Sequence, residues 1–561
     1  MRKSLIILVL TLLMVLGTSC KNYKETNKII YEEPSIITNA TVSAEDENHD
    51  LILTDKVVIQ LYLNYDSLDA YNPSVSSFDA YTKEAANYYY PKNKAIFDQL
   101  GFSGYESYYI SKYLPIIEFE YKKSNFMASN ATVTSQINTN NLIKCAYVKE
   151  VGTSTSPVEG CLVSSVSKSE MNMATEYADR TVTGDGVKVG VYEAGLVNKN
   201  DSAFSNASIT VKRVFFNMYV AEHTTLMAKF IVGNEGIAPG ADLYSAYLDD
   251  TMAGELDWFV DKGVRLINMS CGEKANLGTY SSVSATIDSY AFQYKILFVV
   301  SAGNLGNEDV EYVSNPGLAY NVLTVGSSTD DKNKAPHSSF VEEEGPAKPT
   351  IIAPGYSIGF PSGTDSYSGT SIATALTTGA IACLLEKHPD LFEEPQKLIS
   401  LAVASAERFE VNEIYHLDNG FSDRIGAGEF DYTEFSKSVR FCTAVNNTTG
   451  KSCDTIITKY INLFGGQKVD ISAAWFVPSD GSLLVTQATD YDIYVYNIHT
   501  NSLVGQILST ENVENLHIVN ATDESMSLRI ELKQLGDIRS ATGDRVALTY
   551  HYSWIDDTIE H

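Results

Sequence analysis

The feature that most constrains the fold is a regular alternation of short apolar runs and longer amphipathic runs between residues 170 and 400. The apolar runs predict β-strands at residues 187–192, 242–247, 264–268 and 296–300. The runs between them predict helices at residues 222–232, 253–262 and 282–294. Strands that are apolar almost throughout and alternate with helices form a parallel sheet covered on both faces. We therefore predict an α/β domain over residues 165–440.

A second and a third folded unit are expected on either side, because 561 residues are too many for one core. Residues 51–160 predict a small α+β unit, with strands at 55–64 and 142–148, a helix at 94–100, and one or two strands within 108–121. After residue 440 the helical periodicity disappears, and runs rich in Val, Ile and Tyr recur at 469–477, 492–496, 526–532 and 545–552. Turn residues separate these runs, so residues 441–561 predict an antiparallel β-sandwich.

The N-terminus predicts export. Two positive residues are followed by an apolar run at residues 5–16 and by small residues that end at Cys20. This order is typical of a secretory signal, and the apolar run is too short for a comfortable membrane span. A Cys at this point resembles a bacterial lipoprotein signal, in which Cys20 is lipidated and anchors the protein to the membrane, although Gly17 replaces the usual leucine. An ordinary cleaved signal and a secreted protein are the alternative. Residues 21–50 are polar and predict a flexible tether.

Charge and cysteine content exclude several classes of function. The formal net charge of −29 argues against nucleic acid as a partner, because phosphate binders cluster Lys and Arg. It suits an extracellular surface and permits structural Ca²⁺, although no calcium loop is recognisable. No metal or cofactor motif is present, and we expect no cofactor to be required. Cys442 and Cys453 flank a polar loop that is compatible with a local disulfide, whereas Cys271 and Cys383 are expected to be buried.

Ser371 is a candidate nucleophile. It lies in the sequence Tyr-Ser-Gly-Thr-Ser and opens a segment, rich in Ala, Thr, Ile and Leu, that predicts a helix to Lys387. A serine at a helix N-terminus has an exposed hydroxyl and a free backbone N–H, and the positive helix end suits a forming oxyanion. Gly369 allows a substrate carbonyl to approach. On its own this sequence is more often a helix cap.

Two further residues have suitable side chains. His223 begins a predicted helix after a loop, where a lone histidine is more often structural. Asn304 follows an apolar strand, at the carboxyl end where ligands of α/β proteins bind. Its amide can donate to an oxyanion, which is worth about 3–4 kcal/mol in comparable sites, although a turn asparagine is common.

Together these residues resemble the subtilisin-like serine peptidase family, in which the acid, the histidine and the serine follow in that order. The resemblance is carried by the motifs at residues 184–195, 236–244, 267–272 and 352–355, together with His223, Asn304 and Ser371. It implies that Ser371 attacks, that His223 is general base and then acid, and that Glu193 orients His223. It also implies that Asn304 and the Ser371 N–H bind the oxyanion.

The resemblance extends to the substrate and to the flanking units. It implies that peptides or proteins are the substrates and that the first specificity pocket is lined by Ser270, Cys271, Gly272, Ser301, Ala302 and Gly303. The small size of these residues indicates room for a large apolar or aromatic side chain. Residues 51–160 resemble the inhibitory propeptide of such enzymes, with an attached spacer domain as the alternative. The C-terminal unit is similar to jelly-roll modules of bacterial secreted proteases.

Several residues depart from the family pattern. Glu193 replaces Asp, and its extra methylene moves the carboxylate by about 1.5 Å, where a misplacement of about 1 Å can cost about 10²-fold in rate. Thr224 replaces a glycine beside His223, and Ala375 replaces a proline after Ser371. These departures leave two hypotheses: an active serine endopeptidase, or a pseudoprotease that acts as a surface binding lipoprotein. A lipoprotein of another enzyme class has no motif to support it.

Overall fold

The computed structural model describes residues 28–32, 37–39, 52–65, 77–153, 182–212, 220–248, 251–273, 278–306, 312–341, 346–360, 362, 366–409, 415, 417–448, 453–479, 489–535, 538 and 543–555. The predicted signal and Cys20 lie outside these residues. No helix in this part of the chain is long and apolar enough to cross a lipid bilayer.

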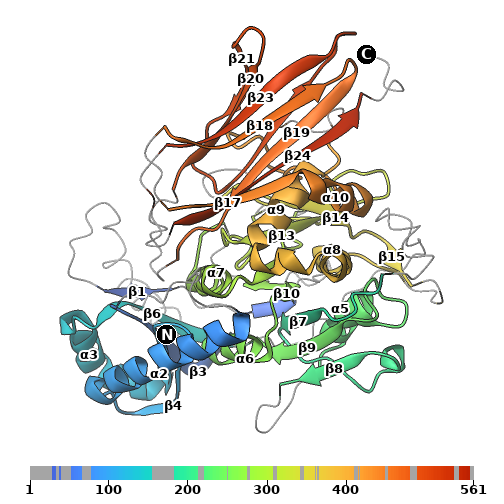
Figure 1. Cartoon of the computed structure of the whole chain (residues 1–561). Helices are drawn as coiled ribbons and strands as arrows, with labels where there is room; N and C mark the ends of the chain where they lie inside the picture. The colour runs from blue at the N-terminus through green and yellow to red at the C-terminus, as the bar shows by residue number, and fades with distance from the viewer. Residues whose placement is uncertain are drawn as a thin grey trace, which may run out of the picture.

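A parallel sheet of seven strands lies at the centre of the molecule (Figure 1). Its strands, in spatial order, are β14 (Ile351–Pro354), β13 (Val322–Ser328), β12 (Leu297–Ser301), β10 (Leu266–Met269), β7 (Lys188–Glu193), β9 (Asp242–Tyr247) and β8 (Ser208–Val211). Every neighbouring pair is parallel. The α/β fold class predicted from the sequence is therefore confirmed.

Helices cover both faces of this sheet. They are α5 (Glu222–Val232), α6 (Ala253–Lys262), α7 (Ser282–Tyr294), α8 (Thr370–Lys387), α9 (Pro395–Ala404) and α10 (Tyr432–Ser438). The chain passes from β7 to β8 at the edge of the sheet, then through α5 to β9, and from β9 through α6 to β10. The helices α6 and α7 contact each other. α8 contacts α5, which places the candidate His223 and Ser371 on the same side.

An N-terminal sheet of five strands packs beside the central domain. It consists of β1 (Ile29–Tyr31), β6 (Ile143–Thr153), β3 (Ile52–Leu63), β5 (Ile116–Lys122) and β4 (Tyr105–Ile110), with helices α2 (Phe78–Leu100) and α3 (Lys123–Thr139). The helix predicted at 94–100 is only the end of α2, and α3 was not predicted. The predicted tether contains β1 and the short strand β2 (Ile37–Asn39), because pairing with distant strands overrides the polar local composition.

Two antiparallel sheets of four strands form the C-terminal β-sandwich, as predicted (Figure 1, orange to red). One contains β17 (Cys442–Asn447), β24 (Asp544–Trp554), β19 (Gln467–Trp475) and β22 (Val513–Val519). The other contains β18 (Thr455–Leu463), β23 (Met526–Gln534), β20 (Tyr491–Asn497) and β21 (Leu503–Ile507). The structure does not form the local disulfide that the sequence allowed between Cys442 and Cys453. Cys442 begins β17 in one sheet, whereas Cys453 precedes β18 in the other.

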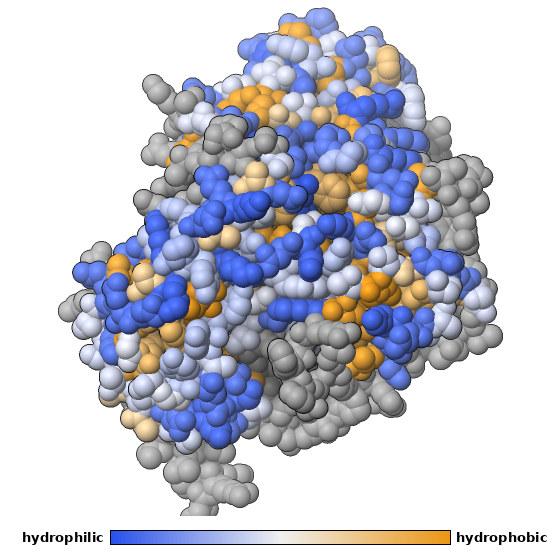
Figure 2. All heavy atoms as spheres, turned by 60° about the horizontal axis from the view of Figure 1, so that its bottom comes forward, coloured by the Kyte–Doolittle hydropathy of each residue, from blue (hydrophilic) through white to orange (hydrophobic). Residues whose placement is uncertain are grey.

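Shorter elements complete the described structure. They are β11 (Cys271–Glu273), the pair β15 (Ile358–Gly359) and β16 (Ser366–Tyr367), and the 3₁₀ turns η2 (Ser202–Phe204), η3 (Pro389–Glu393) and η4 (Val439–Phe441). One apolar cluster runs through all three units, because it includes Tyr62 of the N-terminal sheet, Ile267 of the central sheet and Phe476 of the sandwich. On the surface, hydrophilic side chains are interspersed with small apolar patches (Figure 2). As expected, Cys271 and Cys383 are buried.

Candidate active site

Glu193 and His223 meet at the carboxyl end of the central sheet. Glu193 is the last residue of β7, and His223 is the second residue of α5. The Nδ1 atom of His223 lies 3.0 Å from Oε2 of Glu193. A carboxylate at Nδ1 leaves the other ring nitrogen, Nε2, as the proton acceptor, because the Nδ1–H is held by the carboxylate. The glutamate therefore reaches the histidine in spite of its extra methylene.

Two groups on neighbouring strands hold the other oxygen of Glu193. Oε1 accepts hydrogen bonds from Asn268 Nδ2 at 2.9 Å and from the Ser270 backbone N–H at 3.3 Å. The Glu193 side chain is fully buried. A buried carboxylate is tolerated when hydrogen-bond donors surround it, and here His223, Asn268 and Ser270 supply them.

Ser371 lies in the first turn of α8, as the sequence predicts, but its side chain is fully buried, contrary to the expected exposed hydroxyl. Its backbone N–H has no acceptor among the described residues, in keeping with a helix N-terminus. Its hydroxyl is 3.5 Å from the Ser270 carbonyl oxygen, at the outer limit of a hydrogen bond. No hydrogen bond joins Ser371 to His223, whose buried Nε2 is without a partner in the described part of the chain. Such bonds are often long in unliganded enzymes, and a serine hydroxyl is free to rotate.

The side chain of Asn304 is oriented by the residue that precedes Ser371. Its Oδ1 accepts from the Thr370 backbone N–H at 2.9 Å and from the Thr370 hydroxyl at 3.0 Å. The backbone N–H can only donate, so the atom that faces Thr370 must be the oxygen. The Nδ2 group therefore points elsewhere, and within the described residues it has no acceptor. It is available as a donor beside the nucleophile.

The two departures from the family pattern on α5 and α8 are buried. The Thr224 hydroxyl has no partner in the described part of the chain, and a Cβ atom added at Gly195 would lie 3.2 Å from it. Thr224 therefore occupies the space beside the loop that follows Glu193. Ala375 is fully buried in α8. Neither substitution disturbs the contact between Glu193 and His223.

The residues proposed for the specificity pocket come together only in part. A Cβ atom added at Gly272 would lie 2.2 Å from the Ser314 hydroxyl, and one added at Gly303 would lie 3.4 Å from the same atom. The two glycines therefore meet at Ser314, which the sequence alone did not suggest. The Cys271 side chain points away, because its Sγ lies 3.5 Å from the Tyr192 carbonyl oxygen. Burial and the nearby Glu193 raise the pKa of this thiol, which keeps it uncharged.

The remaining pocket candidates lie at the end of β12. Ser301 is the last residue of that strand, and its hydroxyl has no hydrogen-bond partner in the described part of the chain. Ala302 is fully buried, and the Gly303 N–H donates to the Thr370 hydroxyl at 3.3 Å. This contact ties the end of β12 to the start of α8. The size and selectivity of the pocket stay predictions.

Strand β11, which leads away from Ser270, is already paired. It forms an antiparallel ladder with β2, in which Asn39 faces Cys271, Thr38 faces Gly272 and Ile37 faces Glu273. β2 therefore runs toward Ser270 and Ser371. An extended peptide bound to this edge would have to take the place of β2.

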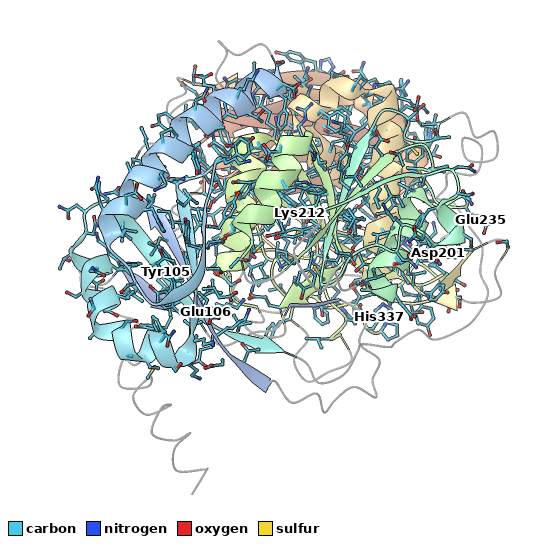
Figure 3. The ribbon with its side chains drawn as sticks, turned by 90° about the horizontal axis from the view of Figure 1, so that it is seen from below. Tyr105, Glu106, Asp201, Lys212, Glu235 and His337 are labelled. Atoms are coloured by element: carbon cyan, nitrogen blue, oxygen red, sulfur yellow. The ribbon has the colours of Figure 1, made fainter. Side chains whose placement is uncertain are left out.

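A second histidine near the central sheet, His337, also has a buried Nε2 without a partner, but among the described residues no carboxylate is bonded to its Nδ1. His337 stacks on Tyr356, with ring centroids 6.1 Å apart. Burial and the nearby Lys334 lower the pKa of His337 to about 4, so it is uncharged at neutral pH. In Figure 3, His337 lies with Asp201 and Glu235 on the side of the molecule opposite to Tyr105 and Glu106 of β4.

Comparisons with known proteins agree with this geometry. A model of the subtilase family matches residues 184–428. Subtilisin NAT from Bacillus subtilis subsp. natto is 30% identical over 227 residues, which are 37% of this chain and 57% of that protein. Subtilisin from Bacillus pumilus is 30% identical over 227 residues, which are 37% of this chain and 79% of that protein.

Solved structures resemble the chain more distantly. The epidermin leader peptide processing serine protease from Staphylococcus aureus, solved as a mutant, is 17% identical, covers 68% of this chain and 99% of its own, and has a TM-score of 0.44. The chain spans 57% of the length of the first curated relatives. From the match to the family model and the identity to the Bacillus pumilus enzyme, we conclude that this chain belongs to the subtilase family.

Proposed function

We propose that the protein is a serine endopeptidase that hydrolyses peptide bonds of extracellular proteins through an acyl-enzyme. The observation that carries this proposal is the 3.0 Å contact between His223 Nδ1 and Glu193 Oε2, which leaves Nε2 without a partner among the described residues. Family membership and the position of Ser371 at the start of α8 support it. A carboxylate at Nδ1 and an open Nε2 form the arrangement that a general base for Ser371 needs.

The groups can act in sequence. We infer that the Ser371 hydroxyl turns from the Ser270 carbonyl toward Nε2 of His223, which takes its proton as the oxygen attacks the substrate carbonyl. The resulting oxyanion accepts hydrogen bonds from Asn304 Nδ2 and the Ser371 N–H. His223 then protonates the leaving amine, and a water molecule activated by the same nitrogen hydrolyses the ester on Ser371. Throughout, Glu193 holds the ring and stabilises its protonated form.

We propose that the N-terminal unit is a propeptide-like inhibitor whose strand β2 covers the substrate edge of β11. The Glu273 N–H donates to the Asn315 carbonyl oxygen at 2.8 Å, on the far side of β11. Because residues of a strand alternate, the backbone of the preceding residue, Gly272, faces β2 and forms the hydrogen-bonded pair with Thr38. This pairing uses the backbone groups that a substrate would need.

Two buried contacts beside β2 support this role. Lys149 of β6 donates to Glu273 at 2.9 Å, and both side chains are almost completely buried. Glu32 follows β1 and accepts from the Ser282 N–H at the start of α7 at 2.7 Å. Removal of one partner from a buried ion pair is strongly destabilising. These contacts therefore hold the unit against the cleft.

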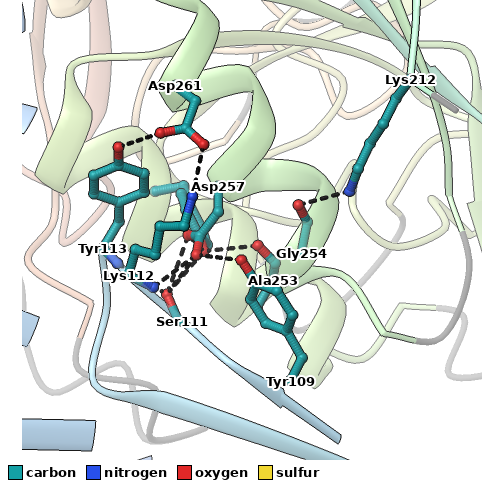
Figure 4. A network of polar contacts seen from close by, with 10 residues as sticks. Tyr109, Ser111, Lys112, Tyr113, Lys212, Ala253, Gly254, Asp257 and Asp261 are labelled. Atoms are coloured by element: carbon teal, nitrogen blue, oxygen red, sulfur yellow. Dashed lines mark hydrogen bonds and ion pairs between the residues drawn. The ribbon is translucent and has the colours of Figure 1, made fainter. Parts of the chain in front are cut away.

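A second polar network joins the N-terminal unit to α6 (Figure 4). Asp257 accepts from the Tyr109 hydroxyl at 2.8 Å and from the Lys112 N–H at 2.7 Å. It also accepts from the Ser111 hydroxyl at 3.1 Å. Tyr290 of α7 also donates to this carboxylate, which is completely buried, and the burial raises its pKa to about 6. The docking of the unit thus encloses an ionisable group.

We further propose that the protein is exported and held on the cell surface by a lipid on Cys20. The order of positive, apolar and small residues before Cys20 supports this location. Secretion after ordinary signal cleavage is the alternative. Structural Ca²⁺ stays a prediction that rests on the acidic composition.

The proposal is tested by cleavage of a fluorescently labelled protein such as casein. Ser371→Ala should lose activity by at least about 10³-fold. Ser368→Ala, a matched change three residues away, should keep most of it. The assay should also be run in a Thr38→Pro background, which removes the N–H that pairs with Gly272. Cleavage that survives Ser371→Ala would overturn the proposal, and absence of cleavage in every form would favour the pseudoprotease.

A further inference from the structure

We propose that Asn268 is a positioning residue that allows a glutamate to serve as the acid of this site. The inference rests on the proposed peptidase function. Asn268 lies on β10, next to β7, and it is fully buried. It touches neither the nucleophile nor the position of a substrate, so it acts through Glu193.

Both the nitrogen and the oxygen of the Asn268 amide form hydrogen bonds. Its Nδ2 group donates one hydrogen to Glu193 Oε1 and the other to the Ser270 hydroxyl, both at 2.9 Å. Its Oδ1 accepts from the Thr378 hydroxyl at 3.1 Å. A carboxylate only accepts, so the nitrogen must face Glu193, and the amide has one orientation.

This orientation accommodates the length of the glutamate side chain. In the register of β7 and β10, Asn268 faces Val191, two residues before Glu193. The Glu193 carboxylate spans from Asn268 at one oxygen to His223 at the other, at 2.9 and 3.0 Å. An aspartate is shorter by one bond, about 1.5 Å, so with the backbone unmoved its carboxylate would be drawn back from Asn268 and His223. Asn268 therefore anchors the outer end of the longer acid and fixes where its second oxygen lies.

The same amide connects the acid to the helix of the nucleophile. The Ser270 hydroxyl, which accepts from Asn268, donates to the Ser371 carbonyl oxygen at 3.0 Å. Rotation of the Asn268 amide would break the contacts to Glu193 and to Ser270 at once. Asn268 therefore helps to fix the acid relative to the nucleophile, together with the Ser270 N–H that also donates to Glu193.

A double-mutant cycle with Glu193→Asp tests this role. Asn268→Ala should lower kcat by about 10–10²-fold, because the carboxylate loses its anchor, and should leave KM within about twofold because no substrate contact is lost. In the Glu193→Asp background the same change should cost less than about threefold, since the shorter acid does not reach Asn268. Thr377→Val, which removes another buried hydroxyl from α8, is the matched control and should show no coupling to Glu193.

A role confined to core packing gives a different result. Asn268→Ala would then lower activity equally with Glu193 and with Asp at position 193, and this equality would overturn the proposal. The acid limb of the pH–rate profile gives a second readout. It should move with Asn268→Ala and stay in place with Thr377→Val, because only the first change alters the support of His223.

A measurement that needs no activity separates this inference from the proposed function. In the Ser371→Ala chain with ¹⁵N-labelled histidine, the Nδ1–H signal of His223 reports its bond to Glu193. Asn268→Ala should shift or broaden that signal, and Thr377→Val should leave it unchanged. An unchanged signal in both would overturn the role of Asn268. If the signal shifts but the chain with Ser371 intact shows no peptidase activity, the positioning role of Asn268 is upheld and the proposed peptidase function is rejected.

Discussion

Two departures from the family pattern at and beside His223 are accommodated in different ways. Glu193 gains length, and the structure absorbs it by engaging Asn268 on the next strand. Thr224 gains bulk, and its hydroxyl is left without a partner among the described residues. The first change keeps the carboxylate at His223, and the second leaves a buried polar group that costs about 1–3 kcal/mol. At the residue scale, the longer acid therefore keeps its contact with His223, whereas the bulkier Thr224 leaves a buried hydroxyl without a partner in the described part of the chain.

The proposed role of Asn304 as an oxyanion donor can be tested with a single substitution. Asn304→Asp keeps the oxygen that accepts from Thr370 and removes the Nδ2 donor. We expect kcat to fall by about 10²–10³-fold with little change in KM, because the donor acts on the oxyanion and not on the bound substrate. Steady-state kinetics on a peptide substrate measure this. A loss confined to KM would show that Asn304 binds the ground state instead.

At the scale of elements, β2 is the segment whose position most affects access to the site. It pairs with β11 through its backbone, so a residue without an N–H should release it. Thr38→Pro should strengthen binding of a fluorescent peptide with the sequence of residues 34–42 to the Ser371→Ala chain by at least about tenfold, because the attached competitor is weakened. Thr38→Ala keeps the N–H and serves as the control. Equal affinity in all three chains would contradict an inhibitory role for β2.

The sequence predicts the elements of the central domain better than those of the N-terminal unit. The helix at 222–232 agrees with α5 residue for residue, because its apolar positions face a buried sheet. The sequence does not predict most of α2, because Pro91 lies inside it and three tyrosines, which favour strands, directly precede the proline. α3 is rich in Asn, Ser and Thr and has little periodicity.

The residues of the candidate site were also predicted only in part from the sequence. Glu193, His223, Asn304 and Ser371 could be found from the sequence because each follows a recognisable motif. Asn268 lies within one of those motifs, but its contact depends on the register of β10 against β7. Ser314 contacts Gly272 and Gly303 only through the tertiary fold. Contacts of this kind have no signal in local composition.

At the scale of the whole molecule, docking of the N-terminal unit buries Asp257 and makes stability depend on pH. The folded pKa of about 6 lies above the ordinary 3.8 because burial disfavours the charged carboxylate. This group therefore contributes stability that is present in full below 3.8 and is lost as the pH rises through about 6. The contribution is at most about 3 kcal/mol, since one pKa unit corresponds to about 1.4 kcal/mol.

Asp257→Asn removes the titration and should flatten this part of the pH dependence. Denaturant unfolding of the wild-type and variant chains between pH 4 and 7 measures the difference. We expect the wild-type chain to lose more stability than the variant as the pH rises, although the variant loses hydrogen bonds at every pH. Parallel curves would show that Asp257 does not titrate in this range.

The central claim is that Ser371 is activated by His223 and Glu193, and a fluorophosphonate probe tests it most directly. The probe reacts with an activated serine and not with an ordinary one. Treatment of the chain that begins after the predicted signal, in wild-type and Thr38→Pro forms, should be followed by mass spectrometry of the labelled peptide. We predict an adduct on Ser371, faster in Thr38→Pro and absent from Ser371→Ala. The account would be contradicted if neither the wild-type nor the Thr38→Pro chain formed an adduct, or if the adduct lay on a residue other than Ser371.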